Sequence, residues 1–331
     1  MKQLTYLRPT SAAEAVEAVT GHPGACYLGG GTNLVDHLKL GITTPDRLVD
    51  VNRLGLDTVE ETETGLRVGA AVRNSDLAAH PVIRRDFPAL SRALLAGASG
   101  QIRNQATTAG NLLQRTRCVY FQDATTPCNK REPGSGCSAI GGYGRYDAVL
   151  GASEACVAVH PSDMAVAMSV LDAEVVVLGP EGERRVPFDE LHRLPGHHPE
   201  RDTTLEHGEL VTAVELTRSS AARRSTYEKA RDRASYAFAL VSVAAALELA
   251  GDDVVDVRIA WGGAAHKPWR ARTAEQLLLG GPLEEQRVRD AVAEELRPAA
   301  TTSENHYKIA MLTGITARAL TRLAVTREDA R

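Results

Sequence analysis

The chain is organised around residues Thr107 to Asp163, which read TTAGNLLQRTRCVYFQDATTPCNKREPGSGCSAIGGYGRYDAVLGASEACVAVHPSD. This stretch holds four of the five cysteines, separated by nine, eight and eighteen residues: Cys118, Cys128, Cys137 and Cys156. Between Gln114 and Tyr146 there is no apolar run long enough to bury a face. Because hydrophobic burial cannot order such a segment, four thiols that close around a metal ion or an iron–sulfur cluster would supply the missing stabilisation.

The spacing of the cysteines leaves alternatives open. The close pairs of a zinc finger are absent, and four free or disulfide-bonded cysteines in a mobile loop also fit. The neighbouring residues favour a cluster, because cations offset its negative charge and glycines let backbone N–H groups approach the sulfur atoms. A solvated basic loop would explain the cations but not the cysteines among them. The residues concerned are Arg115, Arg117, Lys130, Arg131, Arg145, Gly134, Gly136, Gly141, Gly142 and Gly144.

The composition is that of an ordinary soluble globular protein. The chain has 331 residues, 43% of them hydrophobic, and a formal net charge of −4, which predicts two or three domains and no nucleic-acid partner. We find no signal segment and no apolar stretch near the roughly 18 residues of a membrane span. We therefore expect no export address in the chain itself, and no secreted disulfide framework.

A glycine-rich turn in the N-terminal part of the chain is suited to bind the phosphates of a nucleotide. A short strand, Ala25 to Leu28, is followed by the turn Gly29 to Asn33 and by a helix, Leu34 to Leu40. Backbone N–H groups of such a turn, together with the helix dipole, form a phosphate cradle. The turn matches neither G-x-G-x-x-G nor a P-loop, and a tight turn with Thr32 or Asn33 as N-cap is the simpler alternative.

Two further segments, one on each side of the cysteines, are also suited to a nucleotide. Residues Gly97 to Leu112 are rich in small and hydroxyl side chains, which bring backbone close to a ligand and offer several hydrogen bonds. After the cysteines, Ala155 to Val159 is strand-like and His160-Pro-Ser-Asp163 opens a helix that runs from Met164 to Leu171. Ser162 and Asp163 fit a ligand site or, equally, the start of a helix.

The motifs resemble a known family. Leu28-Gly-Gly-Gly-Thr-Asn33, Gln101 to Asn111 and His160 to Asp163, in this order, resemble the FAD-binding subunit of the molybdenum hydroxylases, which include xanthine and carbon monoxide dehydrogenases. The insert from Arg115 to Cys137 resembles that of the flavoprotein subunit of bacterial periplasmic aldehyde oxidoreductases, where it holds a [4Fe–4S] cluster. The 4-hydroxybenzoyl-CoA reductase flavoprotein, with a comparable insert, is the nearest alternative.

The resemblance implies an α+β fold. It consists of a two-part FAD-binding domain of the vanillyl-alcohol-oxidase/PCMH type and a C-terminal antiparallel three-stranded sheet covered by helices. The implied boundaries are 1–55 for the first FAD-binding subdomain, 56–218 for the second with a cysteine-rich insert at 114–156, and 219–331 for the C-terminal domain. Phe238 to Leu249 is helical by propensity, but the resemblance favours a strand.

The resemblance also implies site residues. Ser162 and Asp163 would hold the ribose or adenine end of FAD, Lys229 would reach the flavin ring, and Cys26 would be a buried apolar cysteine. As an alternative, Lys229 is a solvated charge. The four clustered cysteines would ligate the [4Fe–4S] cluster. The remaining expected FAD contacts, at the pyrophosphate and flavin, are Leu28, Gly29, Gly30, Gly31, Thr32, Asn33, Thr107, Thr108, Gly110 and Asn111.

The implied activity is electron transfer. We find no molybdenum-cofactor motif, no further cysteine sets, no nucleophile elbow and no HExxH, and we assign no catalytic residue. The resemblance supplies a large molybdopterin subunit, a small subunit with two [2Fe–2S] clusters, and an external electron acceptor. Such an assembly would be cytoplasmic, or periplasmic by co-export with a signal-bearing partner. A stand-alone flavin oxidase and a zinc-stapled, non-enzymatic interaction module are the alternatives from other classes.

Overall fold

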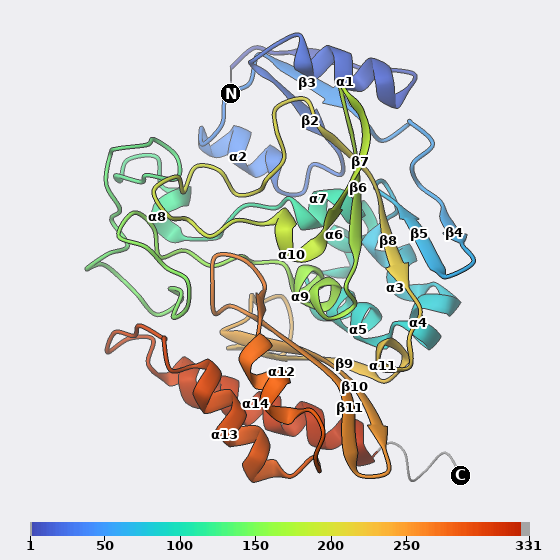
Figure 1. The fold of residues 1–331 in the computed structure, drawn as a ribbon. Coiled ribbons are helices and arrows are strands. Elements are labelled where there is room, and N and C mark those ends of the chain that lie inside the picture. Colours follow the sequence, from blue (N-terminus) through green and yellow to red (C-terminus); the bar gives the residue numbers. More distant parts are fainter. Residues whose placement is uncertain (1, 326–331) are drawn as a thin grey trace.

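The computed structural model describes residues 2–325, which are arranged around three sheets (Figure 1). The first sheet and its helices lie at the top of Figure 1, the second in the middle, and the third at the bottom. Within residues 2–325, no helix is both long and apolar enough to cross a membrane.

The N-terminal unit is a small parallel sheet with strand order β1-β3-β2. Ser11 accepts a hydrogen bond from the Glu14 backbone N–H, and the Glu14 carboxylate accepts one from the Thr10 N–H, which is a capping box for the first helix. The elements are β1 (Thr5–Leu7), α1 (Ala12–Thr20), β2 (Ala25–Leu28), α2 (Leu34–Leu40) and β3 (Arg47–Asp50). The strand expected at Ala25 to Leu28, the turn at Gly29 to Asn33 and the helix at Leu34 to Leu40 are confirmed.

The second unit is an antiparallel sheet with strand order β4-β5-β8-β6-β7 and helices on one side of it (Figure 1). The strands are β4 (Val59–Glu61), β5 (Gly65–Gly69), β6 (Glu174–Gly179), β7 (Gly182–Pro187) and β8 (Leu210–Thr217). The helices are α3 (Asn74–Ala79), α4 (Pro81–Asp86), α5 (Pro88–Ala96), α6 (Gly100–Gln105), α7 (Thr108–Leu112), α9 (Asp163–Val170), α10 (Phe188–Leu191) and α11 (Ser220–Arg223). Pro81 and Pro88 each begin a helix, because proline fits the first helical turn, where its missing N–H has no partner to lose.

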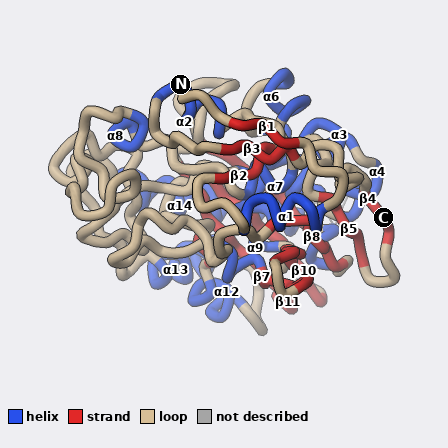
Figure 2. The backbone as a smooth tube through the Cα atoms, turned by 90° about the horizontal axis from the view of Figure 1, so that it is seen from above, coloured by secondary structure: helices blue, strands red, loops and turns tan. Residues whose placement is uncertain are grey.

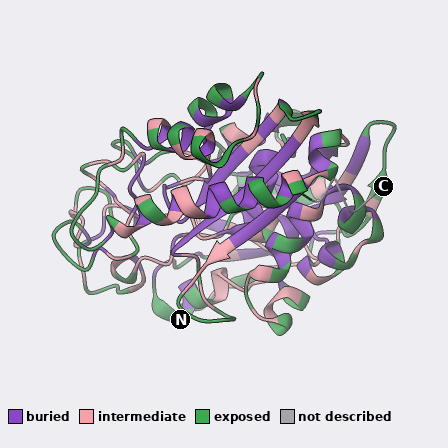
Figure 3. Ribbon diagram, turned by 90° about the horizontal axis from the view of Figure 1, so that it is seen from below, coloured by how far each residue is buried: buried purple, intermediate pink, exposed green. Residues whose placement is uncertain are grey.

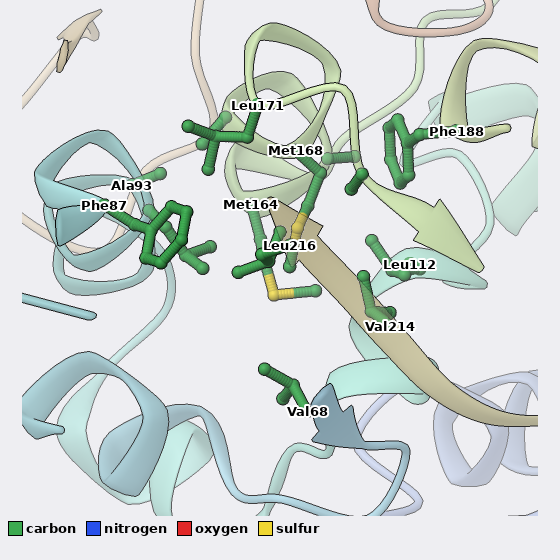
Figure 4. Close-up of a cluster of buried hydrophobic side chains, with 14 of the residues drawn as sticks. Val68, Phe87, Ala93, Leu112, Met164, Met168, Leu171, Phe188, Val214 and Leu216 are labelled. Atoms are coloured by element: carbon green, nitrogen blue, oxygen red, sulfur yellow. The ribbon is translucent and has the colours of Figure 1, made fainter. Parts of the chain in front are cut away.

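The core of this unit centres on α9, all of whose residues are buried. Met164 and Met168 pack among side chains of the helices and strands around them, as Figure 4 shows. Phe87 contributes from the helical side, and Val68 and Leu216 from the sheet. A helix that is apolar on every side must be enclosed, and α9 is enclosed between the second and third sheets.

The C-terminal unit is an antiparallel sheet with order β12-β11-β10-β9. Its strands are β9 (Ser225–Ala230), β10 (Val241–Ala250), β11 (Asp253–Gly262) and β12 (Trp269–Arg270), and its helices are α12 (Arg272–Leu278), α13 (Glu285–Glu295) and α14 (Tyr307–Val325). The three long strands and the covering helices confirm the expected fold. The two-residue β12 adds an edge strand that the sequence did not predict.

Alanine-rich β10 is a strand because it is enclosed on every side. It pairs with β9 along one edge and with β11 along the other, and it packs against α14 and α9. Residues 241–247 are buried, and Figure 3 shows the long strands of this sheet mostly in the colour of buried residues. Small side chains let helices approach both faces, so tertiary packing overrides the helical propensity of alanine.

The cysteine segment, residues 114–156, is almost entirely loop, as the tan tube around α8 (Val119–Gln122) in Figure 2 shows. The strand expected at Ala155 to Val159 is wrong. Cys156 instead closes a turn, with its backbone N–H donating to the Ser153 carbonyl at 3.3 Å, and the Ala148 N–H donates to the Val157 carbonyl. Ala158 lines the cavity of the cysteines, and the segment does not join a sheet.

Candidate functional site

A cavity of about 680 Å³ lies where the three units meet. Thr32 and Asn33 line it from the N-terminal unit, Ser162 from the second unit and Gly263 from the C-terminal sheet. The cysteine segment closes one side with Tyr143, Tyr146 and Asp147, among others. A cavity of this size, with polar groups from several elements, has the dimensions of a cofactor site.

The glycine turn packs directly on the segment before α7. A side chain on Gly30 would place its Cβ 2.1 Å from the Gln105 carbonyl oxygen, and one on Gly29 would come within 3.0 Å of Thr107 Oγ1. Gly31 has a φ of +75°, a conformation that glycine adopts without strain. The fold thus brings together two of the motifs on which the family resemblance rests, and only glycine permits that approach.

Asn33 connects the glycine turn to the cysteine segment. Its Oδ1 accepts the Arg115 backbone N–H at 2.9 Å, and its side-chain amide lies 3.1 Å from His37 Nε2. Asn33 occupies the N-cap position of α2, as the alternative predicted, but its side chain makes no capping hydrogen bond there. Thr32 and Asn33 line the cavity, whereas the side chain of Leu28 and the three glycines are not among its lining residues.

The two expected threonines use their hydroxyl groups inside the fold. Thr107 Oγ1 accepts the Gly110 N–H at the start of α7, and the Thr108 hydroxyl donates to the Val72 carbonyl at 3.1 Å. Both residues are buried and outside the cavity lining, so their contact with FAD stays a prediction. Gly110 and Asn111 do line the cavity.

Ser162 joins α9 to Asn111. Its hydroxyl donates to Asn111 Oδ1 at 2.6 Å and accepts the Ala165 N–H at 3.0 Å, so it is both a helix cap and a part of the cavity wall. Asn111 also accepts a hydrogen bond from the Gln114 amide at 3.0 Å. The helix start expected at Ser162 is confirmed, and its contact with FAD stays a prediction.

Asp163 and Lys229 form a buried ion pair on the cavity wall. Lys229 Nζ lies 2.7 Å from Asp163 Oδ2, and the Tyr227 hydroxyl donates to Asp163 Oδ1. The side chains of Lys229 and Asp163 are only 4% and 8% exposed, so the solvated alternative for Lys229 is wrong. Burial, and then the Asp163 carboxylate, raise the pKa of Tyr227 well above its ordinary value.

This ion pair places the two expected FAD contacts side by side on the cavity wall. We expected Asp163 at the ribose or adenine end of FAD and Lys229 at the flavin ring. Which part of FAD each group contacts stays a prediction. Tyr227 was not predicted, although it lies two residues before Lys229 on β9 and therefore on the same face of the strand.

The cavity residues fit a dinucleotide. Asn74, which is 2% exposed and lines the cavity, has no hydrogen-bond partner for its Oδ1 within the described structure. A buried polar atom without a partner is costly unless a ligand or water satisfies it. Arg103, Arg117 and Lys229 supply positive charge to the lining, which suits a pyrophosphate or a reduced flavin. No sequence pattern distinguished Asn74, which opens α3.

The four clustered cysteines line a second, smaller cavity. Each of the four is a free thiol, and Cys128 and Cys137 are opposed in an isolated antiparallel bridge. Phe121 packs beside them with Cys128 in a small apolar cluster. Burial raises the pKa of Cys118, and it raises the pKa of Cys156 to about 12. Cys26, expected to be buried, is half-buried on β2 and far from this group in the sequence.

The arrangement is not that of a single-ion site. Among residues 2–325, no group of three or more His, Cys, Asp and Glu side chains is arranged to hold one metal ion. A single zinc ion needs sulfur atoms about 2.3 Å from one point, whereas a four-iron cluster spreads its ligands around a body several ångströms across. Four free thiols line one cavity, and cysteine thiolates are the usual ligands of iron–sulfur clusters.

The two cavities share a wall. Thr116, Cys118, Tyr120 and Ala158 line both of them. The cysteine segment is therefore a part of the larger site and not an appendage to it.

The chain matches two known protein families over most of its length. Residues 2–218 match the family described as the FAD binding domain in molybdopterin dehydrogenase, and residues 225–323 match the CO dehydrogenase flavoprotein C-terminal domain. The chain belongs to this family, the FAD-binding medium subunits of the molybdenum hydroxylases.

Two relatives and one solved structure are similar to this chain over most of its length. The aldehyde oxidoreductase FAD-binding subunit PaoB of Escherichia coli is 54% identical over 311 residues, 93% of this chain and 94% of that protein. The glyceraldehyde dehydrogenase medium chain of Sulfolobus acidocaldarius is 27% identical over 88% of this chain and 86% of its own. A structure of carbon monoxide dehydrogenase from Hydrogenophaga pseudoflava, 25% identical, superposes with a TM-score of 0.74 over 97% of this chain and 96% of that chain.

Proposed function

We propose that this chain is the FAD- and [4Fe–4S]-containing electron-transfer subunit of a heterotrimeric, molybdenum-dependent aldehyde oxidoreductase. The observation that carries the proposal is the convergence of four free thiols on one cavity that shares a wall with the larger cavity. The similarity to an aldehyde oxidoreductase subunit supports the substrate class.

The division of labour follows from the residues of the chain. Thr32, Asn33, Asn111 and the Asp163–Lys229 pair would bind FAD, which when bound accepts single electrons and releases two. The four clustered cysteines would hold the [4Fe–4S] cluster, which supplies a one-electron centre beside the flavin. A partner's [2Fe–2S] clusters would deliver the electrons, a large molybdopterin subunit would oxidise the aldehyde, and an external acceptor would take the electrons.

The proposed domain division has support in the sheets. The N-terminal sheet ends at Asp50 and the next begins at Val59, on either side of the proposed boundary after residue 55. The second sheet ends at Thr217 and the third begins at Ser225, on either side of the boundary after residue 218. The cysteine segment at 114–156 interrupts the second unit between α7 and α9.

The test is an absorption spectrum, with flavin, iron and acid-labile sulfide analysis, of the full chain purified anaerobically. The variant is Cys128→Ser, and Cys26→Ser is the matched control because Cys26 lies outside the cluster of cysteines. We expect flavin bands and about four irons per chain, with the iron lost in Cys128→Ser and retained in Cys26→Ser. Flavin without iron would overturn the cluster and leave a flavoprotein subunit, whereas absence of both would overturn the whole proposal.

A further inference from the structure

Lys130 is a buried cation beside the four cysteines. Its side chain is 1% exposed, the residue lines the cysteine cavity, and its charge acts on the Cys156 thiol, whose pKa it lowers against the larger effect of burial. Its Nζ donates to the Pro199 carbonyl at 2.7 Å and pairs with Asp202. Asp202 lies on the long loop after α10, so this contact joins two segments that are 72 residues apart in the sequence.

The other cations of the segment face elsewhere. Arg131 donates to the backbone carbonyls of three residues within its own segment. Arg145 is 42% exposed and pairs with Asp232, where solvent screens its charge. Arg117 lines the larger cavity and lies over the ring of Phe238. Of the five cations identified in the sequence, Lys130 is the one that belongs to the lining of the cysteine cavity.

The charge of the group around Lys130 is well defined. Burial raises the pKa of Asp202, but Lys130 and Arg115 outweigh this effect and bring it to about 2. Burial, and then the charge of Lys130, lower the pKa of His266 to about 4, so this imidazole is neutral at pH 7. Lys130 and Arg115 are positive and Asp202 is negative, which leaves one net positive charge.

Stability alone does not account for such a group. Withdrawing three charges from water costs about as much as their mutual attraction returns, and apolar residues of similar volume are often equally stable. A charge in a low-dielectric site, in contrast, acts strongly on any change of charge nearby. The cysteine cavity is where such a change would occur, because an iron–sulfur cluster gains one negative charge on reduction.

We propose that Lys130, with Asp202 as its counter-charge, sets the reduction potential of the iron–sulfur cluster held by the four cysteines. This inference rests on the proposed function, which supplies the cluster. Lys130 stabilises the reduced, more negative state and raises the potential, whereas Asp202 opposes it and holds Lys130 in place. The two side chains therefore act with opposite signs on the same property.

The experiment is a redox titration of the full chain, followed by the electron paramagnetic resonance of the reduced cluster. Lys130→Met removes the positive charge and keeps the length of the side chain, and Asp202→Asn removes the negative charge and keeps the shape. We expect Lys130→Met to favour the oxidised cluster by about tenfold, a shift of about 59 mV to lower potential for one electron. Asp202→Asn shifts the potential upwards, and the exposed control Arg145→Gln leaves it nearly unchanged.

A merely structural role would not give shifts of opposite sign. Equal potentials in the three variants, or shifts of one sign in Lys130→Met and Asp202→Asn, would overturn the proposal. If Lys130→Met fails to retain iron, Asp202→Asn decides by itself, because an upward shift is expected there and a downward or absent shift contradicts it. Absence of iron from the unmodified chain would overturn the proposed function instead, and the iron analysis separates that outcome from the others.

Discussion

The cysteine segment and the C-terminal sheet are ordered by opposite means. In the sheet, Val241, Val243, Leu247 and Trp261 are fully buried, and apolar packing against helices stabilises both faces. In residues 114–146, by contrast, few apolar side chains are buried, and single polar groups hold much of the backbone in place. Arg131, for example, donates to the carbonyls of Tyr120, Phe121 and Thr126.

This difference predicts how each region responds to a substitution that removes one of its contacts. Apolar packing is distributed over many contacts, and losing a part of it lowers the stability of the whole domain. Polar anchors act locally, and losing one opens a segment while the rest stays folded. The two regions meet at Lys308 of α14, which is fully buried and whose Nζ donates to the carbonyls of Tyr146, Asp147 and Gly263. The following substitutions test this contrast.

The largest effect is expected in the sheet. Trp261 is fully buried, and its indole N–H donates to the Thr316 hydroxyl at 3.0 Å. Trp261→Ala leaves a large cavity and a buried hydroxyl without its donor, so we expect the free energy of unfolding to fall by about 4–5 kcal/mol. Urea denaturation measures it, with Trp261→Phe as the smaller-cavity control. A fall below about 1 kcal/mol would contradict the apolar account of this region.

The buried ion pair on the cavity wall comes next. Lys229→Met leaves the Asp163 carboxylate buried with Tyr227 as its remaining described partner, and we expect a loss of about 3 kcal/mol and weaker retention of flavin. Glu228→Gln is the matched control, because Glu228 points to the opposite face of β9 and pairs with the exposed Arg318. Denaturation and flavin fluorescence measure both variants; equal effects would argue against a specific role for the pair.

The junction at Lys308 should show a pH dependence. Burial lowers the pKa of Lys308 from 10.5 to about 7. Between these values the unfolded chain binds a proton that the folded chain does not, so this group makes stability rise with pH above 7, by at most about 1.4 kcal/mol per unit. Urea titrations at pH 7, 8 and 9 should show the rise in the unmodified chain but not in Lys308→Met. Lys39→Met controls for the loss of one exposed lysine, and a rise that persists in Lys308→Met would refute the assignment.

The smallest effect belongs to the cysteine segment. Arg131→Met removes donors to three carbonyls, and we expect faster proteolysis within residues 114–156 with a change of about 1 kcal/mol or less in global stability. Arg289→Met breaks an exposed pair with Glu285 on α13. It should leave the rate of proteolysis unchanged and alter the free energy of unfolding by no more than about 0.5 kcal/mol. Global unfolding as large as that of Trp261→Ala would erase the contrast between the two regions.

Local signals in the sequence predicted local structure. The strand at Ala25 to Leu28, the helix at Leu34 to Leu40 and the helix that follows Ser162 were predicted, because each depends on residues a few positions apart. Strand β10 required the family resemblance, since its alanines favour a helix until neighbours enclose both faces. The strand predicted at Ala155 to Val159 is absent, because residues with strand propensity form a strand only where a neighbouring strand pairs with them.

In the candidate site, too, the sequence revealed local motifs but not contacts between distant segments. Sequence analysis identified the glycine turn, Ser162 and Asp163, and Lys229, which the fold brings to one cavity. It also identified the four cysteines that share the second cavity. It missed Asn74 and Asp202, whose importance depends on contacts with residues far away in the chain. It also missed the pairing of Asp163 with Lys229, because a contact between α9 and β9 leaves no local pattern.

The hold of α14 on the cavity has a consequence for synthesis of the protein. Glu304 accepts the Gly144 N–H at 2.6 Å, Tyr307 donates to the Arg145 carbonyl at 2.9 Å, and Lys308 binds the next two carbonyls. The wall is thus fixed by residues that leave the ribosome roughly 15 to 60 seconds after the glycine turn, at about 5–20 residues per second. A cofactor that meets the nascent chain encounters a cavity still open on one side, so stable capture must follow translation.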